Sequence, residues 1–369
     1  MDLSFTKSQE LLLKSAKDFL EKECKDIARE SEDTDDGYSP LIWKKMAELG
    51  WLGIVIPEMY GGLDGDILEL IILIQQMGRV LLPGPFLPTA ICSSILLEYG
   101  TKLQKERLLP EISDGKAIVI PAVIEPLPFA GKADGKDMIC IKDECFTVSG
   151  TRLFVPFAHT ADWFVFKICK NDEMFLFLVD SKSDGVKVTM LESLASDKLC
   201  EVVLENVKIP RENLIDDSSQ GVDMIKKFEE AGSICHSAYL LGMLEKILEI
   251  TVDYAKSRVQ FNKPIGSFQA IQHQCANMSI AVEQVKYLTY FAAWKLSKGL
   301  PAIKEVAMAK ARASDAAREV SLIGVKVHGG IGVIDEYDMQ LYFRRAKAAE
   351  LSFGDGAFHR EVIAGNIGL

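Results

Sequence analysis

The sequence lacks the patterns that would place it in several common classes of protein. It has no run of about 18 consecutive apolar residues, so no membrane-spanning helix is predicted. Its eight cysteines form no CxxC pair, and its five histidines share no metal-binding spacing, so no metal site is predicted. We expect the cysteines to be buried thiols in a reducing compartment, which predicts a cytoplasmic protein.

Basic residues are fewer than acidic residues. The chain has 42 Lys and Arg residues against 53 Asp and Glu residues, a formal net charge of −11. Such a balance argues against general affinity for nucleic acid or for anionic membranes. Any binding of phosphate must therefore depend on local basic residues. The first residues, MDLSFTKSQE, contain no basic segment that leads into an apolar one, so no secretory signal is expected.

The 369 residues suffice for two or three domains, and the hydrophobic pattern changes along them. Residues 1–116 read as helical, with capping patterns at Thr6, Ser39 and Thr101. Residues 117–212 contain short runs rich in Val, Ile, Phe and Thr, which predict a small β-barrel or sandwich. Residues 213–369 predict a four-helix bundle, with helices at roughly 221–257, 269–297, 302–325 and one after Asp335. The fold class is therefore α+β, with three domains.

Two of these helical patterns are interrupted by a break at Asn262, Pro264 and Gly266, so the helices are expected to return antiparallel. An arginine, an aromatic ring and an amide stand beside this break, at Arg258, Phe261 and Gln269. This combination suits a ligand with a phosphate and a ring, because a guanidinium binds phosphate through two hydrogen bonds. The alternative is a solvated arginine beside a phenylalanine of the core.

The same segment resembles the C-terminal domain of the acyl-CoA dehydrogenase family. The matching residues are Tyr254, Ala255, Arg258, Phe261, Gln269, Ala270 and Ile271. A second resemblance follows at VHGGIGVIDEYDMQLYFRRAKA, where the family has a Gln-x-x-Gly-Gly-x-Gly signature, and a third lies at WLGIVIPEMYGG. The resemblance covers the whole chain and is strongest after Leu240.

The resemblance implies an FAD-dependent oxidation of an acyl-CoA thioester. In this family a base removes the α-proton, the β-hydride passes to the flavin, and an electron-transfer flavoprotein accepts the electrons. It also implies that Arg258, Phe261 and Gln269 reach the adenine and pyrophosphate of a flavin held mainly by a neighbouring subunit.

The second motif implies further cofactor contacts at Gly329, Gly330 and Gly332, where missing side chains let the backbone approach the cofactor. Lys326 stands where the family usually has Gln, and a lysine can still meet a pyrophosphate as a point charge. The alternative for the glycines is an ordinary turn between two helices.

The β domain departs from the family at the flavin. In IEPLPFAGKAD, Ile124 and Ala130 replace hydroxyl residues that hydrogen-bond the cofactor, each such bond being worth roughly 1 kcal/mol. Phe154 and Pro156 stand near the usual Trp and Thr. Phe154 can stack on the flavin, whereas Pro156 has no donor to offer.

The position of the catalytic base also differs from the family. Gly354 stands where most members have a glutamate. Asp355 follows directly and is our candidate base, with a pKa expected to be raised in an apolar pocket. Glu229 or Glu230 is the alternative, since some relatives carry the base on the first bundle helix. A third possibility is that this chain carries no base.

The resemblance therefore implies an acyl-CoA dehydrogenase that binds FAD and an acyl-CoA and works as a tetramer or a dimer, either as a homo-oligomer or as a hetero-oligomer with a second dehydrogenase subunit. The rival interpretation is a non-catalytic or half-site partner subunit, which would complete the flavin site of a second dehydrogenase in a hetero-oligomer.

Overall fold

The computed structural model describes residues 4–123, 137–142, 145–170, 173–215 and 221–369. They group into two compact units, each assembled from segments that are distant in the sequence. Unit 1 comprises Met1–Ala28, Ile67–Leu82 and Ser233–Leu369, and unit 2 comprises Arg29–Asp66 and Pro83–Gly232. The division into three consecutive domains stays a prediction.

The helix starts predicted from capping patterns are confirmed. α1 (Lys7–Glu23) begins after Thr6, whose hydroxyl accepts the N–H of Gln9 while the Gln9 side chain accepts the N–H of Thr6. α6 (Lys102–Ser113) begins with the same arrangement, and α3 (Pro40–Glu48) begins with a serine cap. These side chains satisfy N–H groups that a helix leaves open at its first turn.

Unit 2 contains further helices besides α3 and α6. They are η1 (Trp51–Gly53), η2 (Glu58–Tyr60), α5 (Phe86–Tyr99), η3 (Ala158–Thr160) and η4 (Arg211–Asn213), and α2 (Ile27–Glu30) lies at its boundary. After η2 the chain returns close to the segment between η1 and η2, because a Cβ on Gly62 would lie 1.9 Å from the carbonyl oxygen of Ile56. Only glycine fits there.

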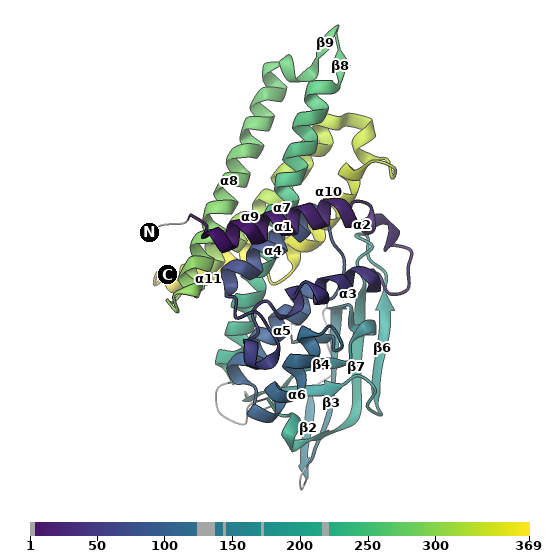
Figure 1. The fold of residues 1–369 in the computed structure, drawn as a ribbon, viewed down its shortest axis with the longest axis vertical. Coiled ribbons are helices and arrows are strands. Elements are labelled where there is room, and N and C mark those ends of the chain that lie inside the picture. The colour runs from purple at the N-terminus through teal and green to yellow at the C-terminus, as the bar shows by residue number, and fades with distance from the viewer. Residues whose placement is uncertain (1–3, 124–136, 143–144, 171–172, 216–220) are drawn as a thin grey trace. The chain divides into compact units, whose positions relative to one another are not determined.

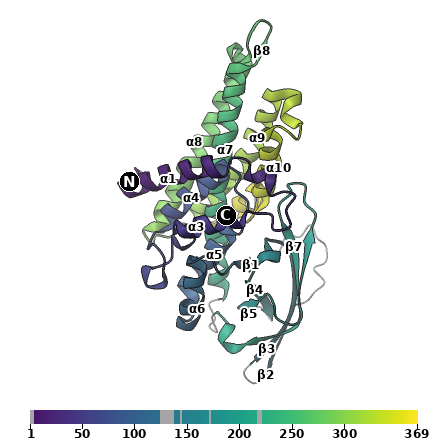
Figure 2. The same ribbon diagram turned by 45° about the vertical axis from the view of Figure 1, so that its right-hand side comes forward.

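The strands of unit 2 form two sheets, which Figure 2 shows. One sheet has the order β1 (Val119–Ala122), β4 (Trp163–Lys170), β5 (Glu173–Asp180). The other has the order β2 (Met138–Lys142), β3 (Cys145–Pro156), β7 (Leu199–Pro210), β6 (Val186–Leu191). β1 runs parallel to β4, and the other pairs within these two sheets are antiparallel. The rings of Phe146 and Phe177 meet edge to face between the sheets, with centroids 5.1 Å apart, so the predicted β region is a sandwich.

A buried ion pair ties the sandwich together. The guanidinium of Arg152 on β3 donates to both carboxylate oxygens of Asp137, at 3.0 and 2.8 Å, and lies over the ring of Phe166. Asp137 also accepts the N–H of Cys169 on β4 at 2.9 Å. The pair therefore joins β3 to β4 inside the sandwich, with hydrogen bonds that offset the cost of burying two charges.

Unit 1 is a helical bundle (Figure 1). Its helices are α1, α4 (Ile67–Arg79), the part of α7 (Gly221–Ser257) from Ser233 onward, α8 (Gln269–Ser297), α9 (Ile303–His328), α10 (Asp338–Leu351) and α11 (Gly356–Asn366). The prediction of one helix after Asp335 is wrong: a turn at residues 352–355 divides it into α10 and α11.

Small residues let these helices approach closely. A Cβ on Gly242 of α7 would lie 1.8 Å from the carbonyl oxygen of Gln75 on α4, and one on Gly78 would lie 2.1 Å from that of Tyr239. The alanines along α9 are buried within the chain, namely Ala307, Ala309, Ala311, Ala313, Ala316 and Ala317. They lie in the core of the bundle, where small side chains let the helices approach.

The cysteines can be compared with the expectation from the sequence. All eight cysteines are described and none forms a disulfide, but Cys140 and Cys145 are exposed, so the expectation that all are buried is wrong.

None of the described helices combines the length and the apolar character needed to cross a bilayer. Across the described ranges, no group of three or more His, Cys, Asp or Glu residues is placed to hold a metal ion.

Candidate functional site

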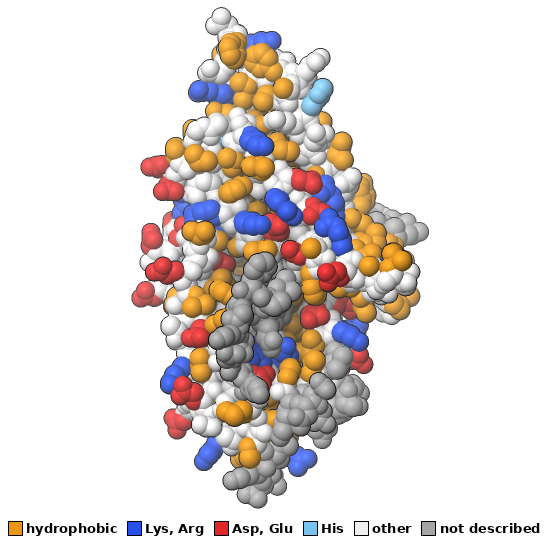
Figure 3. All heavy atoms as spheres, turned by 180° about the vertical axis from the view of Figure 1, so that it is seen from behind, with side chains coloured by type: hydrophobic (Ala, Val, Ile, Leu, Met, Phe, Trp, Pro, Cys, Tyr) orange, Lys and Arg blue, Asp and Glu red, His pale blue; other side chains and the backbone are white. Residues whose placement is uncertain are grey.

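The break between α7 and α8 is a β-hairpin with an unusual turn (Figure 1). β8 (Val259–Gln260) pairs antiparallel with β9 (Lys263–Pro264), and the two turn residues have positive φ, 52° at Phe261 and 63° at Asn262. Asparagine tolerates this conformation, but phenylalanine rarely adopts it. The Phe261 side chain is 86% exposed, and Figure 3 shows hydrophobic side chains at this end of the bundle. A ring held outward on a strained backbone is typical of a binding site and excludes a phenylalanine of the core.

Arg258 and Gln269 lie at the two ends of this hairpin. Arg258 follows the last residue of α7, and its carbonyl accepts the N–H of Ile265 at 2.8 Å. Gln269 is the first residue of α8, and both side chains are exposed. No side chain caps α8 at its start. The open N–H groups and dipole of a helix start favour an anion, so the junction combines two features that attract phosphate.

The glycines of the second motif follow α9, in η6 (Gly329–Val333). Gly329 ends α9 with φ 65°, which glycine adopts without strain. A Cβ on Gly332 would lie 2.9 Å from Cβ of His328, so this glycine is needed by the chain itself. A Cβ on Gly330 would meet no heavy atom within 4 Å, and its φ is not positive. Gly330 is thus free to face a ligand, while the neighbouring Lys326 is exposed on the last turn of α9.

The two motifs are joined by a stack of aromatic rings in unit 1. Tyr254 of the first motif stacks on His328 with ring centroids 4.3 Å apart, and its hydroxyl donates to the carbonyl of His328 at 3.4 Å. His328 is buried, and its Nδ1 donates to the carbonyl of Gly324 at 2.7 Å. Burial lowers the pKa of His328 below its ordinary value and outweighs the opposing effect of the hydrogen bond to Gly324. The sequence analysis missed His328, although it directly precedes the glycines.

Asp355 caps the start of α11. Its Oδ1 accepts the N–H groups of Phe358 at 2.9 Å and Ala357 at 3.0 Å. The Phe358 bond is the largest of the effects that lower the pKa of Asp355, and the Ala357 bond adds to it. The expected raised pKa is therefore wrong, because a helix cap and not an apolar pocket surrounds the carboxylate. The role of Asp355 as the base stays a prediction.

The turn before Asp355 has a conformation that excludes other residues at Gly354. Its φ is 90°, and a Cβ there would lie 2.3 Å from Cδ1 of Phe358. A glutamate at this position would be strained and would clash with Phe358, so this turn requires glycine at position 354. His359 of α11 donates from Nε2 to the carbonyl of Phe353 at 2.9 Å, and not to Asp355. Burial lowers the pKa of His359 to about 4.

We expect Gly354→Ala to lower the free energy of unfolding by more than about 1 kcal/mol, because alanine at positive φ is strained. Gly365→Ala in α11 is the matched control, since a Cβ there meets nothing within 4 Å. It should raise stability by roughly 0.5–1 kcal/mol. Urea unfolding of both variants measures the difference. Equal stability of Gly354→Ala and the parent would contradict the positive φ of Gly354 in this turn.

The alternative bases, Glu229 and Glu230, lie on α7 in unit 2. Desolvation raises the pKa of Glu229 and exceeds the opposing effect of Lys167. Burial also raises the pKa of Glu230, which accepts a hydrogen bond from Lys227 at 3.4 Å. Raised pKa values make both better bases near neutral pH than Asp355.

Phe154 lies at an irregularity of β3, where the pairing with β7 shifts between Arg152 and Val155. Its φ is 56° and its side chain is half exposed. This strained and exposed aromatic residue is consistent with a binding role. Pro156, at the end of β3, pairs with Leu199 at the start of β7. Ile124 and Ala130, in the expected flavin loop, lie outside the described residues.

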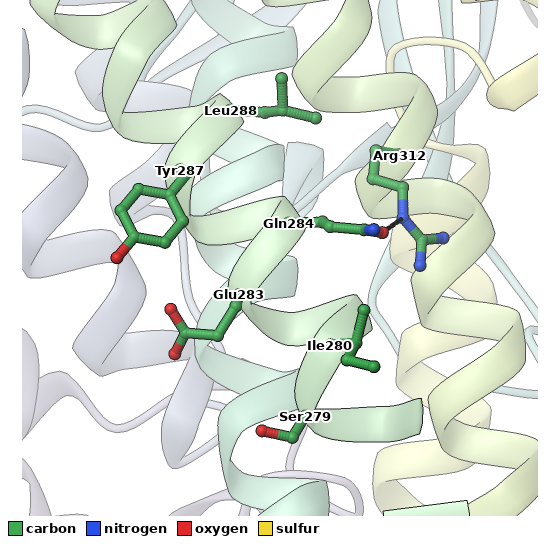
Figure 4. A pocket seen from close by; sticks show the side chains of 7 residues that line it. All are labelled: Ser279, Ile280, Glu283, Gln284, Tyr287, Leu288 and Arg312. Carbon is green, nitrogen blue, oxygen red and sulfur yellow. Dashed lines mark hydrogen bonds between the residues drawn. The ribbon is translucent and has the colours of Figure 1, made fainter. Parts of the chain in front are cut away.

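A shallow hollow lies on unit 1 between α8 and α9 (Figure 4). It is lined by Ser279, Ile280, Glu283, Gln284, Tyr287, Leu288 and Arg312. Ile280 and Tyr287 are more than half exposed, and Arg312 donates to Gln284 at 2.8 Å across the hollow. None of the predicted site residues lines it, so we do not assign it to the cofactor.

Comparison with known proteins agrees with the sequence motifs. Residues 6–116 match the model of the acyl-CoA dehydrogenase N-terminal domain, and residues 219–368 match that of the C-terminal domain. An acyl-CoA dehydrogenase of Bacillus subtilis (strain 168) is 30% identical over 370 residues, covering 97% of each chain.

Solved structures agree as well. Butyryl-CoA dehydrogenase from Megasphaera elsdenii superimposes with a TM-score of 0.91 at 27% identity, covering 100% of both chains. A chain of the ChsE4–ChsE5 complex from Mycobacterium tuberculosis gives a TM-score of 0.92 at 25% identity, covering 100% of this chain and 99% of that one. With two matching domain models and a relative 30% identical over nearly its whole length, the chain belongs to the acyl-CoA dehydrogenase family.

Proposed function

We propose that this protein oxidises an acyl-CoA thioester with FAD. We also propose that the region where its two motifs meet, which we call the joint, carries part of the cofactor site. As a member of its family the protein is an FAD-dependent oxidoreductase. The observation that supports the site is the Tyr254–His328 stack, which fixes the glycine turn against the end of α7. When bound, FAD supplies the acceptor for the hydride that leaves the β-carbon.

The residues of this joint fit the phosphate and adenine end of FAD. Arg258 would donate to a phosphate, and the uncapped start of α8 at Gln269 adds open N–H groups. Phe261 offers an exposed ring for stacking on adenine. Gly330 leaves open space where a side chain would stand, and Lys326 is exposed one turn before it. In unit 2, Phe154 would separately stack on the isoalloxazine ring of the flavin that the subunit itself holds.

We propose Asp355 as the base that removes the α-proton. Both cap hydrogen bonds reach Oδ1, so the second oxygen, Oδ2, can accept the proton without breaking the cap. The lowered pKa keeps the carboxylate ionised at neutral pH, although it makes a weaker base. Electrons would then leave through an electron-transfer flavoprotein.

The alternative is a partner subunit that completes a flavin site on another chain. The asymmetry of the sequence supports it. The residues expected to serve a neighbour's flavin remain, whereas Gly354 and Pro156 replace residues of the subunit's own site. In a homo-oligomer every site needs both halves, so a chain with one half fits a hetero-oligomer. The ChsE4–ChsE5 complex is a related assembly of two different chains.

The experiment that tests the function is anaerobic addition of an acyl-CoA thioester to the purified protein, with the flavin absorbance followed. Bleaching supports oxidation by this chain. A protein that keeps its flavin but is not bleached by short, branched or aromatic thioesters would overturn the proposal, and a protein without flavin would favour the partner subunit.

A further inference from the structure

One buried lysine in unit 1 touches the turn that carries Asp355. Lys310 lies on α9, and its side chain is fully buried. Its ammonium donates three hydrogen bonds, to Oγ of Ser314 at 2.8 Å and to the carbonyls of Glu350 at 2.9 Å and Gly354 at 2.7 Å. All three donors of the lysine are therefore used.

The two carbonyls belong to the two sides of the turn. Glu350 is in the last turn of α10, where carbonyl groups have no partner within the helix, and Oγ of Ser314 donates to the same carbonyl at 3.1 Å. α10 has no basic residue in its own last turn, so Lys310 supplies the positive charge that a helix C-terminus favours. The carbonyl of Gly354 immediately precedes Asp355. Lys310 thus fixes the end of α10 and the turn to the same point on α9.

A charge in this position is costly to the folded state. Burial lowers the pKa of Lys310 to about 7, against the opposing effects of the carboxylates of Glu350 and Asp355. Replacing a whole buried ion pair by apolar side chains is often neutral or stabilising, whereas removing one partner alone leaves the other buried groups unsatisfied. Loss of the lysine alone would leave the carbonyls of Glu350 and Gly354 without this donor, so its contacts act on the turn that they hold.

We propose that Lys310 is a positioning residue that holds the turn at residues 352–355, and with it Asp355, in the geometry used for proton removal. The proposal rests on the function proposed above for Asp355. The sequence carries a signal for it, since Lys310 stands on the alanine-rich face of α9, four residues before Ser314 and seven before Ala317.

The test is hydrogen exchange at the amides of Phe353–Phe358 in Lys310→Met, which keeps the length of the side chain and removes the charge. We expect exchange at these amides to be at least about tenfold faster, because two carbonyls of the turn lose their donor, with a smaller change at amides in the middle of α9. Lys304→Met on the same helix is the matched control, since its side chain is 46% exposed. It should change exchange at neither set of amides.

Two outcomes would overturn the proposal. One is unchanged exchange at the turn in Lys310→Met. The other is exchange that rises throughout α9, α10 and α11 by the same factor as at the turn, which would show a general structural role. If Lys310→Met does not fold, Ser314→Ala takes its place, because it removes one of the acceptors. Unchanged exchange at the turn in that variant would equally overturn the proposal.

A kinetic measurement separates this inference from the function itself. In Lys310→Met we expect a lower kcat with KM for the thioester little changed. Lys310 and Arg318 both lower the pKa of Asp355, so removing Lys310 should move the acidic limb of the kcat profile to higher pH. An unmoved limb would contradict the link to Asp355. If no thioester is oxidised by the parent protein, the proposed function fails, and the exchange experiment still decides the role of Lys310 in the turn.

Discussion

Asp355→Asn should slow the reduction of the flavin by acyl-CoA by at least about 100-fold, the scale expected for the loss of a general base. Asparagine is as good a helix cap as aspartate, so the hydrogen bonds to Ala357 and Phe358 should remain. The variant should therefore unfold at the same urea concentration as the parent. Rapid mixing of variant and thioester without oxygen, with flavin absorbance as the signal, measures the chemical step.

Matched variants at the alternative bases make this result specific. Glu229→Gln and Glu230→Gln remove the two carboxylates whose pKa values burial raises. If Asp355 is the base, both variants should reduce their flavin at nearly the rate of the parent. If flavin reduction stays at the parent rate in Asp355→Asn but slows in Glu229→Gln or Glu230→Gln, the base lies on α7. Parent-like rates in all three would mean that none of these carboxylates is the base.

Arg258→Ala should weaken the retention of FAD by about 10- to 100-fold, because a buried phosphate would lose a charged hydrogen bond worth about 1.5–3 kcal/mol. Dialysis followed by measurement of bound and free flavin gives the affinity. Lys256→Ala is the matched control, since Lys256 is exposed in the last turn of α7 and carries the same charge.

The two variants distinguish a direct contact between Arg258 and phosphate from a general electrostatic attraction of FAD. A loss confined to Arg258→Ala supports a direct contact with phosphate. Equal losses in both variants would indicate a diffuse effect of positive charge, which added salt should weaken further. Unchanged affinity in Arg258→Ala would remove this residue from the site.

Much of the fold could be predicted because local interactions determine it. The caps at Thr6, Ser39 and Thr101 bind N–H groups only three residues away, so their patterns are visible in the sequence. The β region was predicted from its short runs rich in Val, Ile, Phe and Thr, and strands β1 to β7 all lie within the predicted residues 117–212. The hairpin between α7 and α8 likewise follows from its turn residues.

The environment of Asp355 could not be predicted in the same way. The analogy with the usual base suggested an apolar pocket, whereas the following residues start a new helix and turn the carboxylate into its cap. A sequence signal was present, because aspartate before a helical segment is a common cap. The family pattern outweighed it in the prediction.

Lys310 was missed because its role depends on tertiary contacts. Glu350 and Gly354 lie 40 and 44 residues further along the chain, and no local pattern indicates that their carbonyls meet on α9. His328 was missed for the same reason, since its stacking partner Tyr254 lies 74 residues away. Buried polar groups of this kind are satisfied across the fold, not along the sequence.

Native mass spectrometry with flavin quantitation, on protein purified alone and then treated with acyl-CoA, tests the central claim most directly. The account predicts a homo-oligomer with one FAD per chain, whose flavin is bleached by the thioester without oxygen. An assembly of this chain alone without flavin, which gains flavin and activity only when a second dehydrogenase chain is added, would contradict it.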